Sequence, residues 1–144
     1  MPTEVLYSTK ARATGGRDGT SGTLDGAFKV TLSTPKELGG DGKDGNNPEQ
    51  LFASGYAACF LGAMKFVAGH SEDLKMKIPD DASVTSTVGI GPRSEGGFGL
   101  DVKLEVSLPG IDKELATKLV EEAHQVCPYS NATRGSLDIN PVVV

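Results

Sequence analysis

Cysteine is scarce in this sequence: only two occur among 144 residues, and they lie far apart. That separation excludes a CxxC redox pair and the four-ligand sets of structural zinc sites. In a reducing compartment, two such cysteines are more commonly reactive or simply buried than joined as a permanent staple. The N-terminal residues show no basic segment followed by an apolar one. No secretory signal is therefore predicted, and we expect a cytoplasmic protein.

Several common functional motifs are also absent. The glycine-rich segment 38–46 contains Gly42 and Lys43, but it has neither the earlier glycine nor the following Ser or Thr of a phosphate-binding loop. It also lacks the alternating ligands and distal glutamate of a calcium loop. No Gly-x-Ser-x-Gly pattern occurs, so a hydrolase is not favoured. The net charge of −5 and the sequence pI of about 5.0 argue against a nucleic acid or an anionic membrane as partner.

The most informative segment is residues 47–70, which predict a long helix. Asn47 is a helix-capping residue type, Pro48 suits the first helical position, and Glu49 suits the positive end of the helix dipole. Residues 51–64 include no charged side chain and many small ones, so we expect a helix that is apolar on every side. Such a helix lies in a core or a subunit interface. We take the run to be too short and too rich in small residues for a bilayer span.

Strands are predicted on both sides of this helix. Alternating and β-branched residues indicate strands at Val5–Ala13 and Thr23–Leu32, joined by a glycine-rich turn that presents Arg17. Ser83–Ile90 and Phe98–Leu108 predict a hairpin. The second of these strands alternates strictly between apolar and polar residues, so one face of the hairpin is expected to be buried.

A second helix and a closing strand complete the expected order of elements. Asp112 caps the helix, which ends at Pro128 and whose apolar stripe places Cys127 on the buried face. Leu137–Val144 reads as a strand, and its proline indicates a sheet edge. His124 is taken as a helix-end or surface residue, because one histidine near one cysteine falls far short of a metal site. We predict one α+β domain over residues 1–144.

Four residues together suggest a chemistry that none of them indicates alone. A buried cysteine commonly only packs, Arg17 could be a solvated loop residue, and Glu49 a simple helix-start charge. A thiol attacks a peroxide only as the thiolate, however, and burial of Cys59 would raise its pKa. A neighbouring arginine favours the thiolate, and an acid paired with that arginine would orient it. With Cys127 added, the set suits a thiol peroxidase.

Three blocks of the sequence, Arg17–Gly19, Asn47–Phe60 and Cys127–Gly135, resemble the organic hydroperoxide resistance (Ohr) proteins of the Ohr/OsmC family. They occur in the same order, and the resemblance extends over essentially the whole chain. Ser54, where another small residue such as alanine is expected, is a minor departure. The resemblance implies an OsmC-like fold, with antiparallel sheets packed around a long buried central helix plus a second amphipathic helix. It also implies an intertwined homodimer.

The resemblance further implies a thiol-dependent peroxidase that acts on organic hydroperoxides, including those of fatty acids. By match to the family motifs, Cys59 would be the peroxidatic thiolate, Cys127 the resolving thiol, and Arg17 with Glu49 the activating pair. The Cys59–Cys127 disulfide would be reduced by a lipoyl-type dithiol, either dihydrolipoamide or a lipoylated protein. No metal or other cofactor is expected.

Aromatic residues around Cys59 would suit an apolar substrate; we expect Phe52, Tyr56, Phe60 and Phe98 to contribute to the substrate pocket. Glu49 and Cys59 are about ten residues apart, or ~15 Å along a straight helix. Either the helix breaks near Ser54, or Arg17 and Glu49 serve the cysteine of the partner chain. Two other functions stay open: a peroxidase of the OsmC subgroup with other substrate and reductant preferences, and a non-catalytic dimeric binder of apolar ligands.

Overall fold

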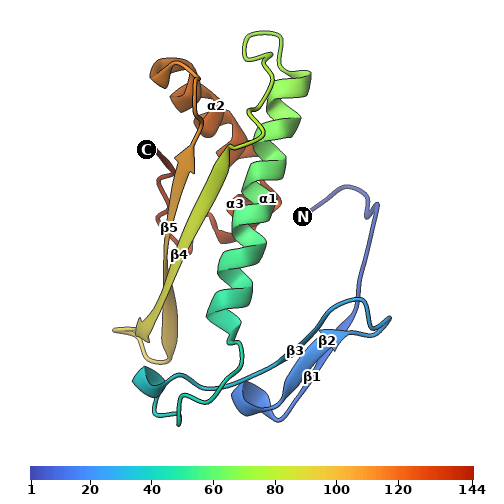
Figure 1. Cartoon of the computed structure of the whole chain (residues 1–144), viewed down its shortest axis with the longest axis vertical. Helices are drawn as coiled ribbons and strands as arrows, with labels where there is room; N and C mark the ends of the chain where they lie inside the picture. The colour runs from blue at the N-terminus through green and yellow to red at the C-terminus, as the bar shows by residue number, and fades with distance from the viewer. The chain divides into compact units, whose positions relative to one another are not determined.

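The structure, a computed structural model that describes residues 1–144, contains strands and helices in an order that confirms the α+β class (Figure 1). Its contacts divide the chain into two units, Met1–Leu51 and Phe52–Val144, which are described separately. The expected single domain stays a prediction.

The Met1–Leu51 unit is built on a small antiparallel sheet in the order β1-β2-β3. Its strands are β1 (Ala11–Thr14), β2 (Thr20–Thr23) and β3 (Lys29–Thr31). Two short 3-10 helices, η1 (Gly16–Asp18) and η2 (Lys36–Leu38), follow β1 and β3.

The predicted strand boundaries in this unit are wrong. Residues 5–10 lie outside any strand, and the segment predicted as one strand from Thr23 to Leu32 turns back on itself. The Asp25 carboxylate causes the turn, because it accepts hydrogen bonds from the Thr23 hydroxyl at 2.7 Å and the Ala27 N–H at 2.9 Å. Gly26 follows with a φ of 78°. Local side-chain bonding of this kind competes with continued strand pairing.

Helix α1 (Pro48–His70) begins where the sequence predicted. The Asn47 Oδ1 atom accepts a hydrogen bond from the Gln50 N–H at 2.9 Å, and Gln50 Oε1 accepts one from the Asn47 N–H at 3.1 Å. This reciprocal capping box satisfies two backbone donors that a helix start would leave free. The helix continues without interruption past Ser54, so the break considered from the sequence does not occur.

In the single chain, α1 is buried along one face rather than on every side. Tyr56, Phe60, Ala63, Met64, Val67 and Ala68 are buried, whereas Ser54, Ala58, Gly62, Phe66 and Gly69 are exposed. By length and composition alone, α1 could also cross a bilayer, so the expectation that it is too short was wrong on that point. A core helix of a soluble protein passes the same test, and the packed face of α1 favours that interpretation.

The Phe52–Val144 unit contains the predicted hairpin, formed by β4 (Ser83–Pro92) and β5 (Phe98–Ser107). Antiparallel pairing runs from Ser83 opposite Ser107 to Pro92 opposite Phe98. The predicted alternation is confirmed, because Val102, Leu104 and Val106 are buried. The closing strand β6 (Val142–Val143) is much shorter than predicted and pairs parallel with β5, so this sheet is mixed and has β6 at its edge.

Two further helices pack with α1 and the sheet around one core. Helix α2 (Lys113–Val126) is capped by Asp112, whose carboxylate accepts from the Leu115 N–H at 3.2 Å as predicted. A short helix that the sequence reading missed, α3 (Pro128–Thr133), follows at once. The core consists largely of aliphatic side chains from α1, β5 and α2.

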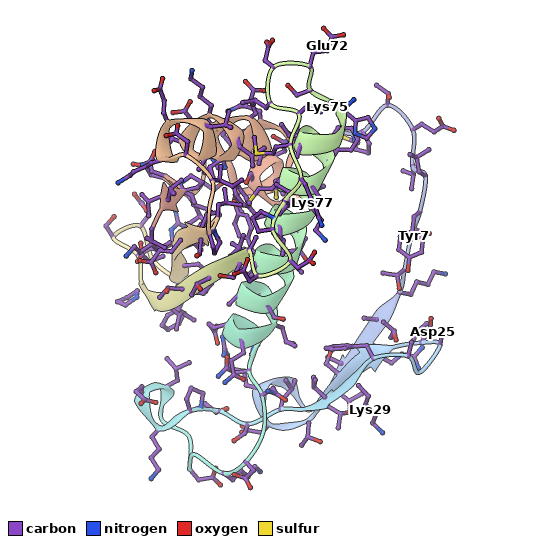
Figure 2. The ribbon with its side chains drawn as sticks, turned by 45° about the horizontal axis from the view of Figure 1, so that its top comes forward. Tyr7, Asp25, Lys29, Glu72, Lys75 and Lys77 are labelled. Atoms are coloured by element: carbon purple, nitrogen blue, oxygen red, sulfur yellow. The ribbon has the colours of Figure 1, made fainter.

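The loop after α1 lies against this core through its apolar side chains. Leu74 and Ile78 are buried, whereas Glu72, Lys75 and Lys77 project outward (Figure 2). The segment is therefore held against the core by its apolar side chains, although its exposed charged residues are typical of a polar link.

Candidate functional site

Arg17 and Glu49 meet within the Met1–Leu51 unit as a two-point ion pair. Arg17 Nη1 donates to Glu49 Oε2 at 2.9 Å, and Nη2 donates to Oε1 at 2.7 Å. The side chains keep 35% and 13% of their exposure, so the pair is partly shielded from water. Hydrogen bonding to Glu49 raises the pKa of Arg17, and hydrogen bonding to Arg17 lowers the pKa of Glu49, with partial burial opposing both shifts. Both groups are thus charged and mutually oriented.

The turn that carries Arg17 depends on close backbone contact. A Cβ atom at Gly19 would lie 1.7 Å from the Thr14 carbonyl oxygen, so no other residue fits there without rearrangement. Asp18 ties the same turn to the following segment, because its Oδ1 accepts from the Thr34 N–H at 3.1 Å. The glycines therefore let η1 fold tightly while Arg17 reaches Glu49.

The two cysteines, 68 positions apart in the sequence, meet in the Phe52–Val144 unit. Their sulfur atoms are 3.7 Å apart, with the Cys127 thiol donating toward the Cys59 sulfur. Cys59 is half-buried in the middle of α1, and Cys127 is completely buried. A disulfide has sulfurs about 2.05 Å apart, so these are two free thiols whose sulfurs are in contact but not bonded.

The sequence predicted that Cys127 lies in the last turn of a helix. In the structure it occupies the junction between α2 and α3. Its backbone is extended, with φ −61° and ψ 122°, which separates the two helices. Its N–H still donates to the Ala123 carbonyl at 2.8 Å, and its carbonyl accepts from Asn131 at 3.0 Å. Pro128 begins α3, where the lack of an N–H does no harm. A proline directly after a helix end was the signal that could have revealed α3.

Burial is the main influence on the Cys59 thiol and raises its pKa. A hydrogen bond from the Tyr129 backbone N–H lowers this pKa, whereas electrostatic repulsion from Cys127 raises it further. A thiol with a raised pKa is mostly protonated at neutral pH and reacts slowly. Rapid attack on a peroxide would therefore require a cation near the sulfur.

The four aromatic residues expected in the pocket have different surroundings. Tyr56 and Phe60 are completely buried in the core, whereas Phe98 is 72% exposed at the hairpin. Phe52 is partly buried and lines a cavity of about 520 Å³ together with Leu100 and Leu137. Their shared role as a substrate pocket stays a prediction.

Sequence reasoning missed other residues near the cysteines. The Tyr129 ring packs on Phe52 and Tyr56, with ring centroids 6.1 and 5.6 Å apart. Ser130 is completely buried, and His124 is hydrogen-bonded to it rather than being a free helix-end residue. Nothing in the periodicity singles out Ser130, since a serine in a short helix is usually exposed. The structure contains no group of three or more His, Cys, Asp or Glu residues placed to hold a metal.

Comparison with known proteins identifies relatives of this chain. The family model for OsmC-like proteins matches residues 40–142. An organic hydroperoxide resistance protein of Xanthomonas axonopodis pv. citri (strain 306) is 56% identical over 138 residues, which cover 96% of this chain and 94% of that protein.

Solved structures show the same fold. An organic hydroperoxide resistance protein of Legionella pneumophila superimposes with a TM-score of 0.89 at 46% identity, covering 97% of this chain and 98% of that one. OhrB of Bacillus subtilis gives 0.84 at 38% identity, covering 97% and 100%. The chain therefore belongs to the OsmC-like family, and within it to the organic hydroperoxide resistance (Ohr) proteins.

Proposed function

We propose that this protein protects against organic hydroperoxides by reducing them to alcohols as a thiol-dependent peroxidase. Resistance to such peroxides is the role that gives its relatives their name. The observation that carries the finer proposal is the pair of free thiols whose sulfurs are 3.7 Å apart, one of them half-buried and the other completely buried.

In the first step, the Cys59 thiolate attacks the outer oxygen of the hydroperoxide. A sulfur–oxygen bond forms, the oxygen–oxygen bond breaks, and the alkoxide leaves and takes up a proton to become the alcohol. Cys59 is then a sulfenic acid. The Tyr129 N–H that hydrogen-bonds the Cys59 sulfur supports this assignment, because it stabilises the thiolate form.

In the second step, Cys127 attacks the sulfur of the Cys59 sulfenic acid. A disulfide forms, the sulfur–oxygen bond breaks, and the hydroxide leaves as water with the thiol proton. A dithiol then restores both thiols through two exchange reactions. We propose a dithiol of the lipoyl type as reductant, because its second sulfur can complete the exchange within the same molecule.

Arg17 and Glu49 would supply the cation that Cys59 needs. Their two-point pairing supports this role, because it holds a permanently charged guanidinium in one orientation. Since α1 is continuous, about ten residues of helix, or ~15 Å, separate Glu49 from Cys59 of the same chain. We therefore propose that the pair serves the partner subunit's Cys59.

A homodimer is the assembly that this proposal requires. The exposed face of α1 supports it, because small residues at Ser54, Ala58 and Gly62 recur every four positions and would allow close approach of another backbone. Phe66 continues the same face and is 52% exposed. We propose that the dimer acts in the cytoplasm.

The decisive experiment is a free-thiol count on the reduced protein before and after one equivalent of cumene hydroperoxide. Loss of both thiols within seconds, with recovery by dihydrolipoamide rather than by glutathione, is expected. Hydrogen peroxide should react more slowly. If both thiols survive, the peroxidase proposal is wrong, and ligand binding becomes the better explanation.

Two variants refine the test. Cys59→Ser should abolish turnover, whereas a protein that merely binds apolar ligands would keep its ligand in this variant. Arg17→Gln should raise the pKa of Cys59 and slow peroxide attack without unfolding the protein. An unchanged thiol pKa would remove Arg17 from the mechanism.

A further inference from the structure

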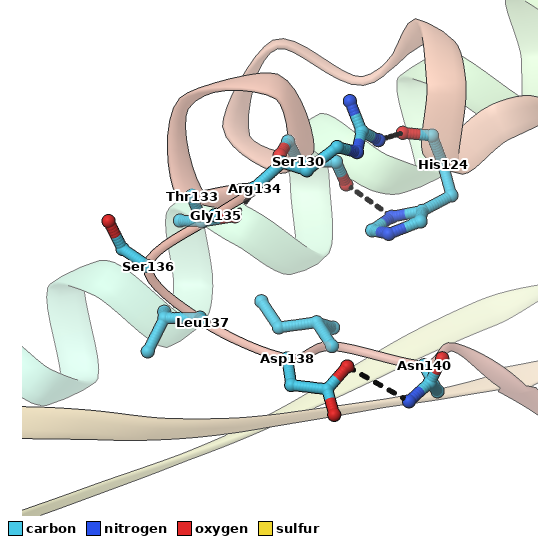
Figure 3. A pocket seen from close by; sticks show the side chains of 10 residues that line it. His124, Ser130, Thr133, Arg134, Gly135, Ser136, Leu137, Asp138 and Asn140 are labelled. Atoms are coloured by element: carbon cyan, nitrogen blue, oxygen red, sulfur yellow. Dashed lines mark hydrogen bonds between the residues drawn. The ribbon is translucent and has the colours of Figure 1, made fainter.

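A buried set of hydrogen bonds connects the helices that carry the two cysteines. The Ser130 hydroxyl lies 2.9 Å from the Tyr56 hydroxyl and 2.8 Å from His124 Nδ1. Tyr56 and Ser130 are completely buried in a core that is otherwise mostly aliphatic. Figure 3 shows the His124–Ser130 bond at the edge of a cavity of about 490 Å³. We call these three residues the brace.

The three residues of the brace lie close in the sequence to the two cysteines. Tyr56 lies three residues before Cys59 on α1, and His124 and Ser130 lie three residues before and after Cys127. Each member is therefore about one helical turn from a cysteine. The Tyr56–Ser130 bond links α1 to α3, and the Ser130–His124 bond links α3 to α2.

The position of Cys127 relative to Cys59 depends on how α2, α3 and α1 are held together. It stands at the extended junction between α2 and α3, with its N–H bonded back into α2 and its carbonyl bonded forward into α3. The His124–Ser130 bond spans this junction and fixes the angle between the two helices. The Tyr56–Ser130 bond then sets the distance from the junction to the helix that carries Cys59.

We propose that Tyr56, Ser130 and His124 are positioning residues that hold Cys127 in line for attack on oxidised Cys59. This inference rests on the proposed peroxidase function. The sulfurs must approach from 3.7 Å to about 2.05 Å when the disulfide forms. With the helices held, that approach is left to local movement of the two cysteines. Without the brace, Cys127 would reach the same geometry only part of the time.

The hydrogen-bonding capacities of the three groups allow one continuous chain of hydrogen bonds. A neutral histidine accepts at one ring nitrogen, so the Tyr56 hydroxyl can donate to Ser130, and the Ser130 hydroxyl can donate to His124. Burial and the nearby positive charge of Arg134 both lower the pKa of His124 and so favour the neutral ring. Arg134 also donates to the His124 carbonyl at 2.7 Å, which helps to fix the end of α2 (Figure 3).

Rapid-quench mass spectrometry of a single turnover tests this role. Tyr56→Phe and Ser130→Ala each remove one oxygen atom and change little else. In Ser130→Ala, which lies outside the predicted substrate pocket, we expect Cys59 to be oxidised at the wild-type rate. In both variants the sulfenic acid should last at least about tenfold longer relative to its rate of formation, because a misplacement of ~1 Å can cost ~100-fold in rate. Trapping by dimedone should increase in proportion. Ser136→Ala, which removes an exposed hydroxyl outside the brace, is the matched control.

A substitution series at His124 separates positioning from general stabilisation. Asn can place a polar atom near the position of Nδ1, so His124→Asn should keep most of the disulfide rate, whereas His124→Leu should lose it. Melting temperatures are measured in parallel. Variants with lower melting temperatures but wild-type rates of disulfide formation would overturn the inference. If Ser130→Ala fails to fold, His124→Asn and His124→Leu still supply this comparison.

The wild-type protein distinguishes this inference from the proposal on which it rests. If wild-type protein keeps both thiols after hydroperoxide, the peroxidase function fails, and the brace has no disulfide step to assist. If wild-type protein forms the disulfide and the brace variants form it equally fast, only the positioning role is overturned.

Discussion

Replacement of Cys127 by alanine should stop the proposed cycle after Cys59 has reduced the hydroperoxide and before a disulfide forms. Cys59 would still attack the hydroperoxide, because its sulfur and the Tyr129 N–H remain in place. The resulting sulfenic acid would then have no thiol partner within the site. We expect one equivalent of hydroperoxide to be consumed at no less than the wild-type rate, because Cys127 raises the pKa of Cys59. The oxidised protein should accumulate as Cys59 sulfenic acid rather than as a disulfide.

The size of this effect follows from the geometry of the two sulfurs. They are 3.7 Å apart in the reduced protein, close to the 3–3.5 Å separation of a near-attack arrangement. Well-oriented groups reach effective concentrations of at least ~10⁵ M. Even if the effective concentration of Cys127 at Cys59 were only ~10 M, four orders of magnitude lower, it would exceed 1 mM of an added thiol by a factor of ~10⁴. Resolution of the variant by 1 mM external thiol should therefore be about 10⁴-fold slower than disulfide formation in the wild type.

The assay must follow sulfur chemistry directly, because the sequence contains no tryptophan to report on the reaction. Acid quench after mixing, followed by mass spectrometry, separates thiol, sulfenic acid and disulfide. Alanine is preferred to serine, because a serine hydroxyl in this completely buried position would cost about 1–3 kcal/mol without a partner. If the sulfenic acid of the variant disappears as fast as that of the wild type, Cys127 is not the resolving thiol.

Two further predictions concern stability and are measured by urea unfolding. The lowered pKa of Glu49 means that its pair with Arg17 stabilises the protein fully above the unfolded-state pKa of about 4.5 and loses this contribution as pH falls through the lower folded-state value. Glu49→Gln should thus cost about 1 kcal/mol at pH 7, and the deficit should shrink in acid; a pH-independent deficit would contradict the ion-pair explanation. Asp112→Ala should cost about 1 kcal/mol through loss of the α2 cap, whereas Asp112→Asn should be nearly neutral; equal losses in both would argue against capping.

The parts of the fold that the sequence predicted well share a long and regular pattern. The helix from Pro48, the strand from Phe98 and the helix after Asp112 each repeat apolar residues over several turns or pairs. In the strand from Phe98 and the helix after Asp112, the pattern also determines which face is buried without knowledge of the partner element. The strand predicted over Thr23–Leu32 was misplaced because one carboxylate, Asp25, redirects the backbone, and a pattern of three or four residues cannot outweigh it.

For the candidate site, too, the sequence identified the residues but not their geometry. Arg17, Glu49, Cys59 and Cys127 were found from residue types and from their resemblance to family motifs. Only the structure decided that Arg17 and Glu49 form a two-point ion pair and that the two sulfurs lie 3.7 Å apart. Distances across 68 positions depend on how helices pack, and no local pattern contains that information.

The sequence by itself thus determined the helix that carries Cys59, the alternation of the hairpin, and the residue types available for thiol chemistry. The tertiary structure decided that α1 buries only one face in the single chain, that Cys127 stands at a junction between helices, and that Ser130 and His124 join Tyr56 in a buried brace. The physical reason is that periodicity reports on burial along one element. A hydrogen bond between elements requires two side chains to meet, and only the packed fold brings them together.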